Sequence, residues 1–273
     1  MQKGLLEELM NKKEDLHEDL VDHIDEDSPI GVFLRHPLLM TLYVEDMNAY
    51  YNHQYLGKKK ECDKALKNKK WNTWIWLHER PFRLDAFLFI CRDIPAEEYW
   101  SLLRDIWIDT EGPGVNQDIW LELFNRPYPK RRKMMTGKER RALASAGRAS
   151  VELNIYRGYV DGLDPEDSEY IEEDRDRESG ISWTLDYNKA EWFARRFLAG
   201  GTGYGVVAEA ICNPKDVIAY FESRGEKEIV IDPSKVRILR SQALPTEEET
   251  QKEMKDLMEN RPDECKFVGS KVR

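Results

Sequence analysis

The apolar residues of this chain change their spacing near residue 150, and this change limits the folds that the chain can adopt. Beyond that point they form short runs bounded by glycine, proline and acidic residues, a pattern typical of strands. The runs begin at Val151, Ile181, Val206, Val217, Glu228 and Val236. Among them, only the segment from Tyr187 to Leu198 has helical spacing, with Asp186 as its N-cap. Many short strands with few crossover helices predict an α+β fold rather than a doubly wound parallel sheet.

The first 110 residues have a different pattern, in which aliphatic residues recur at helical spacing near the start and aromatic residues follow at mixed spacing. The aliphatic residues from Leu5 to Ile24 predict an amphipathic helix that ends before Pro29. The tyrosines, tryptophans and phenylalanines of residues 30–57 and 71–108 predict short helices with a core of large side chains. A platform that stacks nucleic-acid bases is the alternative interpretation of these aromatic residues.

One break and two helix signals lie between these parts. Glycine and proline at residues 111–114 break the pattern, and residues 119–124 then return to helical spacing. Thr136 and Glu139 have the spacing of a capping box, which predicts a helix through residues 140–146.

Charge is distributed unevenly along the chain, whose net charge is −10. Basic residues cluster at Lys58 to Lys70 and at Arg126 to Arg148, and each cluster is either a solvated surface or a region that attracts an anionic partner. Acidic residues dominate residues 161–178, which we expect to form a solvated loop or short helix.

Several features favour a cytoplasmic protein. No run of about 18 apolar residues predicts a membrane span, and the leucines of the first 20 residues alternate with charges, unlike those of a secretion signal. The four cysteines form no CxxC pair, so they indicate neither a zinc site nor a disulfide framework. All five histidines precede residue 79, and we expect no metal site near the strands.

Three short motifs in the strand-rich part carry candidate chemistry. Arg157 stands at the end of an apolar run beside Gly158, where a guanidinium can bind phosphate and a glycine lets a ligand approach the backbone. Alternation along the second run sends Ser182 and Thr184 to one face, so that both hydroxyls can line one site.

The third motif is Glu226-Lys227-Glu228, at the start of an apolar strand. Period-two alternation predicts that Glu226 and Glu228 share a face. Two neighbouring carboxylates can hold a cationic ligand or orient a nucleophile.

The order of these motifs resembles the mono-ADP-ribosyltransferases with an Arg–Ser–Glu triad, the cholera-toxin-like and clostridial-toxin-like branch. Ile-Tyr-Arg-Gly at Arg157 is similar to the first core strand of that family, and Ser182-Trp-Thr184 resembles its Ser-Thr-Ser motif, with Trp in the middle position. Glu226-Lys-Glu228 resembles its Glu-x-Glu strand, and residues 220–225 resemble its target-recognition loop. The resemblance spans about Leu153 to Leu239.

The resemblance implies a split, mainly antiparallel ADP-ribosyltransferase fold that binds NAD as co-substrate without a metal. NAD would contact Arg157, Gly158, Ser182, Thr184 and Glu228. The catalytic residues would be Glu228, which stabilises the charge as nicotinamide leaves, with Glu226, Arg157 and Ser182. Tyr220, Phe221 and Glu226 would recognise the acceptor.

The implied organisation is a helical accessory region over residues 1–110, a catalytic domain over residues 111–245 with core strands from about 151, and a tail or helix over residues 246–273. The implied function is transfer of ADP-ribose to protein arginine, or second to an RNA or DNA base. An NAD glycohydrolase and an inactive NAD- or nucleic-acid-binding module of the same fold are the alternatives. A bacterial toxin with a neutralising partner protein, or a phage-defence or phage-encoded effector, is the setting that fold analogy suggests.

Other nucleotide-binding classes lack their sequence signatures. The glycines at residues 201, 203 and 205 follow a predicted helix and precede a predicted strand, which is the reverse of the Rossmann order. The sequence also contains no phosphate-binding P-loop motif.

Overall fold

The computed structural model contains two compact units, which are described separately. Unit 1 comprises residues 1–113 and 125–135, and unit 2 comprises residues 114–124 and 136–273. The division therefore differs from the single boundary expected near residue 110. The structure describes residues 4, 8, 9, 11–28, 31–110, 116–162, 178–196, 203–222 and 225–245. The predicted tail (246–273) and most of the acidic segment lie outside these residues.

Unit 1 contains a small antiparallel sheet, which was not predicted within the helical region expected over residues 1–110. The strands are β1 (Ile24–Asp25), β2 (Phe33–His36) and β3 (Leu39–Leu42), in that order. The turn between β2 and β3 is fixed by His36, whose Nδ1 accepts a hydrogen bond from the backbone N–H of Leu38 at 3.0 Å. Strands of two to four residues are too short for their alternation to be distinguished from a helical pattern.

The long helix predicted from Leu5 to Ile24 is also wrong within the described residues. Helix α2 spans only Glu18–Val21, and residues 12–17 are not helical. The buried Asn52 of α3 (Asn48–Lys67) accounts for this break. Its Oδ1 accepts from the backbone N–H of His17 at 2.8 Å, and its Nδ2 donates to the carbonyl of Asp15 at 2.9 Å. These bonds satisfy backbone groups that a continuous helix would pair internally.

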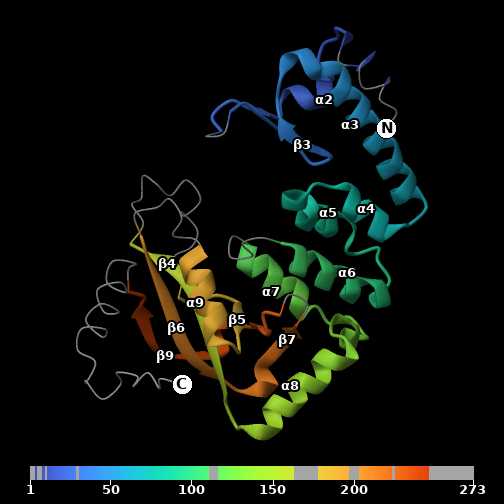
Figure 1. The fold of residues 1–273 in the computed structure, drawn as a ribbon. Coiled ribbons are helices and arrows are strands. Elements are labelled where there is room, and N and C mark those ends of the chain that lie inside the picture. Colours follow the sequence, from blue (N-terminus) through green and yellow to red (C-terminus); the bar gives the residue numbers. More distant parts are fainter. Residues whose placement is uncertain are drawn as a thin grey trace, which may run out of the picture. The chain divides into compact units, whose positions relative to one another are not determined.

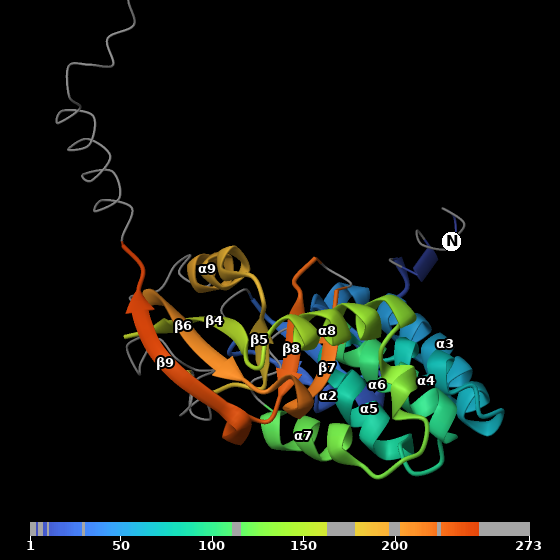
Figure 2. The same cartoon turned by 90° about the horizontal axis from the view of Figure 1, so that it is seen from below.

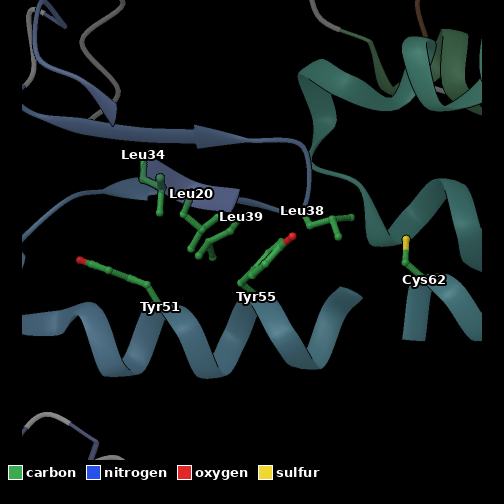
Figure 3. Packing of buried hydrophobic residues seen from close by; sticks show 7 residues of the cluster. All are labelled: Leu20, Leu34, Leu38, Leu39, Tyr51, Tyr55 and Cys62. Carbon is green, nitrogen blue, oxygen red and sulfur yellow. The ribbon is translucent and has the colours of Figure 1, made fainter. Parts of the chain in front are cut away.

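The core of this part of unit 1 lies between the β2–β3 hairpin and helix α3 (Figure 3). Tyr51 and Tyr55 project from α3 toward leucines of the hairpin and of α2. The buried members of the cluster are Leu20, Leu34, Leu38, Leu39, Tyr51, Tyr55 and Cys62. The aromatic side chains of this cluster thus form core rather than an exposed base-stacking platform, as expected for the aromatic side chains of residues 30–57.

The rest of unit 1 is helical, as predicted. Its further helices are α4 (Trp71–Leu77), α5 (Arg83–Ile90) and α6 (Ala96–Asp109). Residues 125–135 pack against α6, where the indole Nε1 of Trp100 donates to the carbonyl of Pro129 at 2.9 Å. Trp100 and Trp107 are both fully buried, so they too are core residues.

Unit 2 contains an antiparallel sheet (Figure 1), whose strand order β7-β8-β5-β4-β6-β9 can be followed in Figure 2. Its strands are β4 (Leu153–Asp161), β5 (Ser182–Thr184), β6 (Tyr204–Cys212), β7 (Val217–Phe221), β8 (Glu228–Ile231) and β9 (Val236–Ala243). All of the strand pairs in the described part of this sheet are antiparallel. The predicted α+β class is therefore confirmed, and each of the six predicted runs contributes a strand.

Three helices of unit 2 also match sequence signals. They are α7 (Gln117–Asn125), α8 (Gly137–Ala149) and α9 (Tyr187–Arg196). The capping box predicted at the start of α8 is confirmed: the Oγ1 of Thr136 accepts from the backbone N–H of Glu139, and the carboxylate of Glu139 accepts from that of Thr136. Asp186 accepts from the backbone N–H of Asn188 at 3.1 Å, as expected of an N-cap.

Helix α9 lies on one face of strands β4 and β6 (Figure 2). The contact is closest at Gly158, where a Cβ atom would lie 1.8 Å from the carbonyl oxygen of Ala190 and 2.7 Å from the backbone nitrogen of Ala194. The close approach that the sequence assigned to a ligand is therefore made, on this side of Gly158, by the backbone of α9. Glycine is required here because any side chain would push the helix off the sheet.

None of the helices that the structure describes is long and apolar enough to span a bilayer.

The first prediction concerns the pH dependence of the stability of unit 1. Burial lowers the pKa of His36 to about 4, with the nearby His23 as the next cause. The unfolded chain, in which histidine has a pKa of about 6.5, binds more protons than the folded chain between these values, so stability falls as pH falls through this window. We expect a loss of about 1 kcal/mol at pH 5.5 relative to pH 8 in urea unfolding. The variant His36→Asn should lack this component, and an equal pH dependence in both proteins would contradict the assignment.

The second prediction uses two glycines in different surroundings. Gly158→Ala should destabilise unit 2 by about 3 kcal/mol or more, because the added methyl group meets helix backbone rather than a flexible side chain. Gly57→Ala is the matched control, since nothing lies within 4 Å of a Cβ atom at that position in α3. It should be neutral or stabilise by about 0.5–1 kcal/mol. Similar urea midpoints for the two variants would refute the proposed packing.

Candidate functional site

Strands β4 and β5 pair at one described position, Tyr156 with Thr184. By contrast, β4 pairs with β6 along its whole length, from Leu153 to Asp161. The sheet is therefore weakly joined between β4 and β5, and side chains provide the additional links there. The candidate site residues predicted from the sequence lie at and around this junction.

Arg157 crosses the junction from β4 to β5. Its Nη1 donates a hydrogen bond to the carbonyl oxygen of Ser182 at 2.9 Å. Its guanidinium lies so close to Gly180 that a Cβ atom there would be 2.1 Å from Cζ of Arg157. Gly180 was not singled out in the sequence, because nothing in the sequence indicates that it lies under a distant arginine.

Ser182 links Arg157 to the carboxylate expected to be catalytic. Its Oγ donates to Oε1 of Glu228 at 2.7 Å, so Ser182 is bound to Arg157 through its carbonyl and to Glu228 through its hydroxyl. Glu228 is the first residue of β8 and is 9% exposed. The structure thus brings together the three residues predicted as a triad and holds the carboxylate in one orientation.

The neighbouring strand positions explain why these side chains meet. Thr184 pairs with Glu228 and Ser182 pairs with Val230, so Ser182 and Glu228 project from the same face of adjacent strands. Trp183, between them, projects to the other face and is 2% exposed. Its indole Nε1 donates to the carbonyl of Gly180 at 2.6 Å. This hydrogen bond holds Gly180 in place against the guanidinium of Arg157.

Thr184 has a different role from the predicted contact with NAD. It is 5% exposed, and its hydroxyl donates to the carbonyl of Glu226 at 2.5 Å while accepting from the backbone N–H of Asp186 at 3.0 Å. A hydroxyl has one proton to donate, so the interaction with Glu226 uses the donor capacity of Thr184. Thr184 therefore positions Glu226 and the start of α9.

The alternation expected for Glu226 and Glu228 is wrong. Strand β8 begins at Glu228, and Lys227 has a left-handed backbone conformation with a φ of 48°. A non-glycine residue in that region interrupts extended geometry, so period-two alternation does not reach Glu226. Lys227 is held by two contacts: its carbonyl accepts from the N–H of Leu185 at 3.1 Å, and its Nζ lies 3.1 Å from Oδ2 of Asp186. The hydrogen bond from Lys227 lowers the pKa of Asp186.

The predicted recognition loop begins later than expected. Tyr220 and Phe221 belong to β7 and are 4% and 1% exposed, so their side chains form core rather than an acceptor surface. Large, mainly apolar side chains are expected at these two positions because both are buried in the core of unit 2. Of the remaining loop, Ser223 and Arg224 lie outside the described residues.

The basic cluster from Arg126 to Arg148 is divided between the two units. Arg126 to Met135 belongs to unit 1 and the residues from Thr136 to unit 2. Several of the cations pair within their own unit, for example Lys130 with Glu97 and Lys138 with Glu222, the latter at 2.7 Å. The lysines of α3 behave similarly, because Lys59 lies 2.5 Å from Asp19. Both clusters are therefore partly neutralised.

The arrangement in unit 2 combines a guanidinium with a fixed carboxylate. A guanidinium binds phosphate oxygens through its planar set of donors, and a carboxylate stabilises positive charge that develops near it. Among the described residues, no group of three or more histidine, cysteine or acidic side chains could hold a metal ion.

Comparison with models of protein families, with curated proteins and with solved structures finds no match for this chain.

Proposed function

We propose that unit 2 is an NAD-dependent mono-ADP-ribosyltransferase that cleaves the nicotinamide–ribose bond and transfers ADP-ribose to a macromolecule. The observation that carries this proposal is the pair of hydrogen bonds at Ser182, to Arg157 at 2.9 Å and to Glu228 at 2.7 Å. It assembles a phosphate-binding cation and an oriented carboxylate from β4, β5 and β8.

These residues fit NAD as a substrate. NAD carries a diphosphate, which the guanidinium of Arg157 would bind, and a ribose next to a positively charged nicotinamide. When the bond between ribose and nicotinamide breaks, its electron pair leaves with nicotinamide and positive charge develops on the ribose ring. The carboxylate of Glu228 would stabilise that charge without having to reorganise, because Ser182 already holds it.

Glu226 is proposed to act on the acceptor rather than on NAD. The attacking group forms a new bond to the ribose carbon and loses a proton, which a carboxylate can accept. A carboxylate also pairs with guanidinium in two parallel hydrogen bonds, so protein arginine is the acceptor that Glu226 fits best. An RNA or DNA base is the second candidate acceptor, supported by the basic residues of α8, among which Arg140, Arg141 and Arg148 are exposed.

The acceptor class can be read from one labelling experiment. NAD labelled in its adenine part is incubated with the protein and a cell lysate, and the sample is divided between protease and nuclease. We expect label on macromolecules that protease removes. Glu226→Gln should lower this transfer by roughly 10²–10⁴-fold, as expected for loss of a general base, with a smaller effect on nicotinamide release.

Other outcomes would replace the proposal. Label removed by nuclease would assign the enzyme to nucleic-acid modification. Label that stays free as ADP-ribose would favour an NAD glycohydrolase with water as acceptor. If the protein neither released nicotinamide nor bound NAD, the enzyme would be refuted. Only a module of this fold without the activity would then remain.

The toxin setting, with a neutralising partner protein or a role in phage defence, rests on fold analogy alone. Expression of the active protein in bacteria without growth arrest would contradict it.

A further inference from the structure

The connection between β7 and β8, residues 222–227, is tied to helix α8 by one buried side chain. Glu139 is 3% exposed, although it belongs to the first turn of a helix whose neighbouring residues Lys138 and Arg140 are exposed. Its Oε2 accepts from the backbone N–H of Thr136 at 2.7 Å, which is the capping interaction. Its Oε1 accepts from the backbone N–H of Glu222 at 3.2 Å, which capping does not require.

Hydrogen bonds continue from that anchor to Glu226. The N–H of Gly225 donates to the carbonyl of Glu222 at 3.1 Å, and this hydrogen bond between two described residues closes a turn. Gly225 has a φ of 65°, a conformation that favours glycine. At the far end of the turn, the carbonyl of Glu226 accepts from Thr184. The turn that carries Glu226 is therefore fixed at its start by Glu139 and at its end by Thr184.

Glu228 is held by other contacts. It pairs with Thr184 on one side and with Phe221 on the other, and its carboxylate is bound by Ser182. Loss of Glu139 would therefore loosen the start of the turn, where the ion pair of Lys138 with Glu222 at 2.7 Å remains, while leaving the supports of Glu228 in place.

We propose that Glu139 is a positioning residue that orients Glu226 and so sets the share of cleaved NAD that reaches an acceptor rather than water. This proposal rests on the proposed function. It adds a residue outside the triad that affects where the ADP-ribose goes. A carboxylate is needed because two backbone N–H groups, those of Thr136 and Glu222, each require an acceptor oxygen. Glutamine supplies one acceptor oxygen and an NH₂ donor, so it can satisfy only one of them.

The test compares Glu139→Gln with Thr136→Ala in the full chain. Thr136→Ala removes the hydroxyl that caps α8 but leaves the backbone N–H of Thr136 and the carboxylate of Glu139 in place. It should cost about 1 kcal/mol of stability, as for other lost N-caps. Hydrogen–deuterium exchange of a peptide spanning Tyr220 to Lys227 reports the anchor directly, and nicotinamide release and macromolecular labelling in lysate report the two reaction outcomes.

We expect faster exchange in that peptide for Glu139→Gln and not for Thr136→Ala. We also expect labelling to fall about 10-fold or more in Glu139→Gln, with nicotinamide release changed less than about 3-fold, because a displacement of about 1 Å strongly affects a positioned reacting group. Unchanged exchange, or an equal fall of both activities in Glu139→Gln, would overturn the proposal.

Failure of the proposed function would look different. Absence of nicotinamide release from the unaltered protein, with the exchange difference still present, would refute the transferase and the effect on transfer while retaining Glu139 as an anchor of the turn.

Discussion

One weak junction in the sheet of unit 2 determines how the candidate site is built. Between β4 and β5 the described backbone pairing is limited to Tyr156 and Thr184, so the side chain of Arg157 supplies a further link by binding the carbonyl of Ser182. Because the strands are not paired beyond this point, a guanidinium can lie between them over Gly180. Arg157 is half-buried there, and the carbonyl of Ser182 provides a hydrogen-bond partner for its guanidinium. The same serine then orients Glu228, so the junction and the site depend on one residue.

Much of this site could be predicted from the sequence, because its motifs lie on strands whose pattern is local. Arg157, Ser182 and Glu228 each stand beside an apolar run, and the register of antiparallel strands brings Ser182 and Glu228 to one face. The parts that could not be predicted depend on long-range contacts or on backbone conformation. Gly158 is a glycine because α9 touches it, and Glu226 leaves the strand because Lys227 is left-handed. Neither fact has a signature in the neighbouring residues.

Unit 1 shows more clearly that long-range contacts cannot be predicted from local sequence. The aromatic residues of α3 and α6 were predicted as core, and most of them are buried, whereas Tyr50 is half-buried. The hairpin of β2 and β3 was missed, because four-residue strands carry too little alternation. The break in the first predicted helix depends on Asn52, which lies more than 30 residues away along the chain. A residue that satisfies distant backbone groups cannot be identified from local periodicity.

We propose that Glu228, fixed by Ser182, stabilises positive charge on the ribose of NAD. Release of nicotinamide from labelled NAD by the purified protein measures that step without reference to any acceptor. The account predicts release by the unaltered protein and its loss by roughly 10²-fold or more in Glu228→Gln, which keeps the size of the side chain and removes its charge. Equal release by the two proteins, or none by the unaltered protein under any condition in which NAD binds, would contradict it.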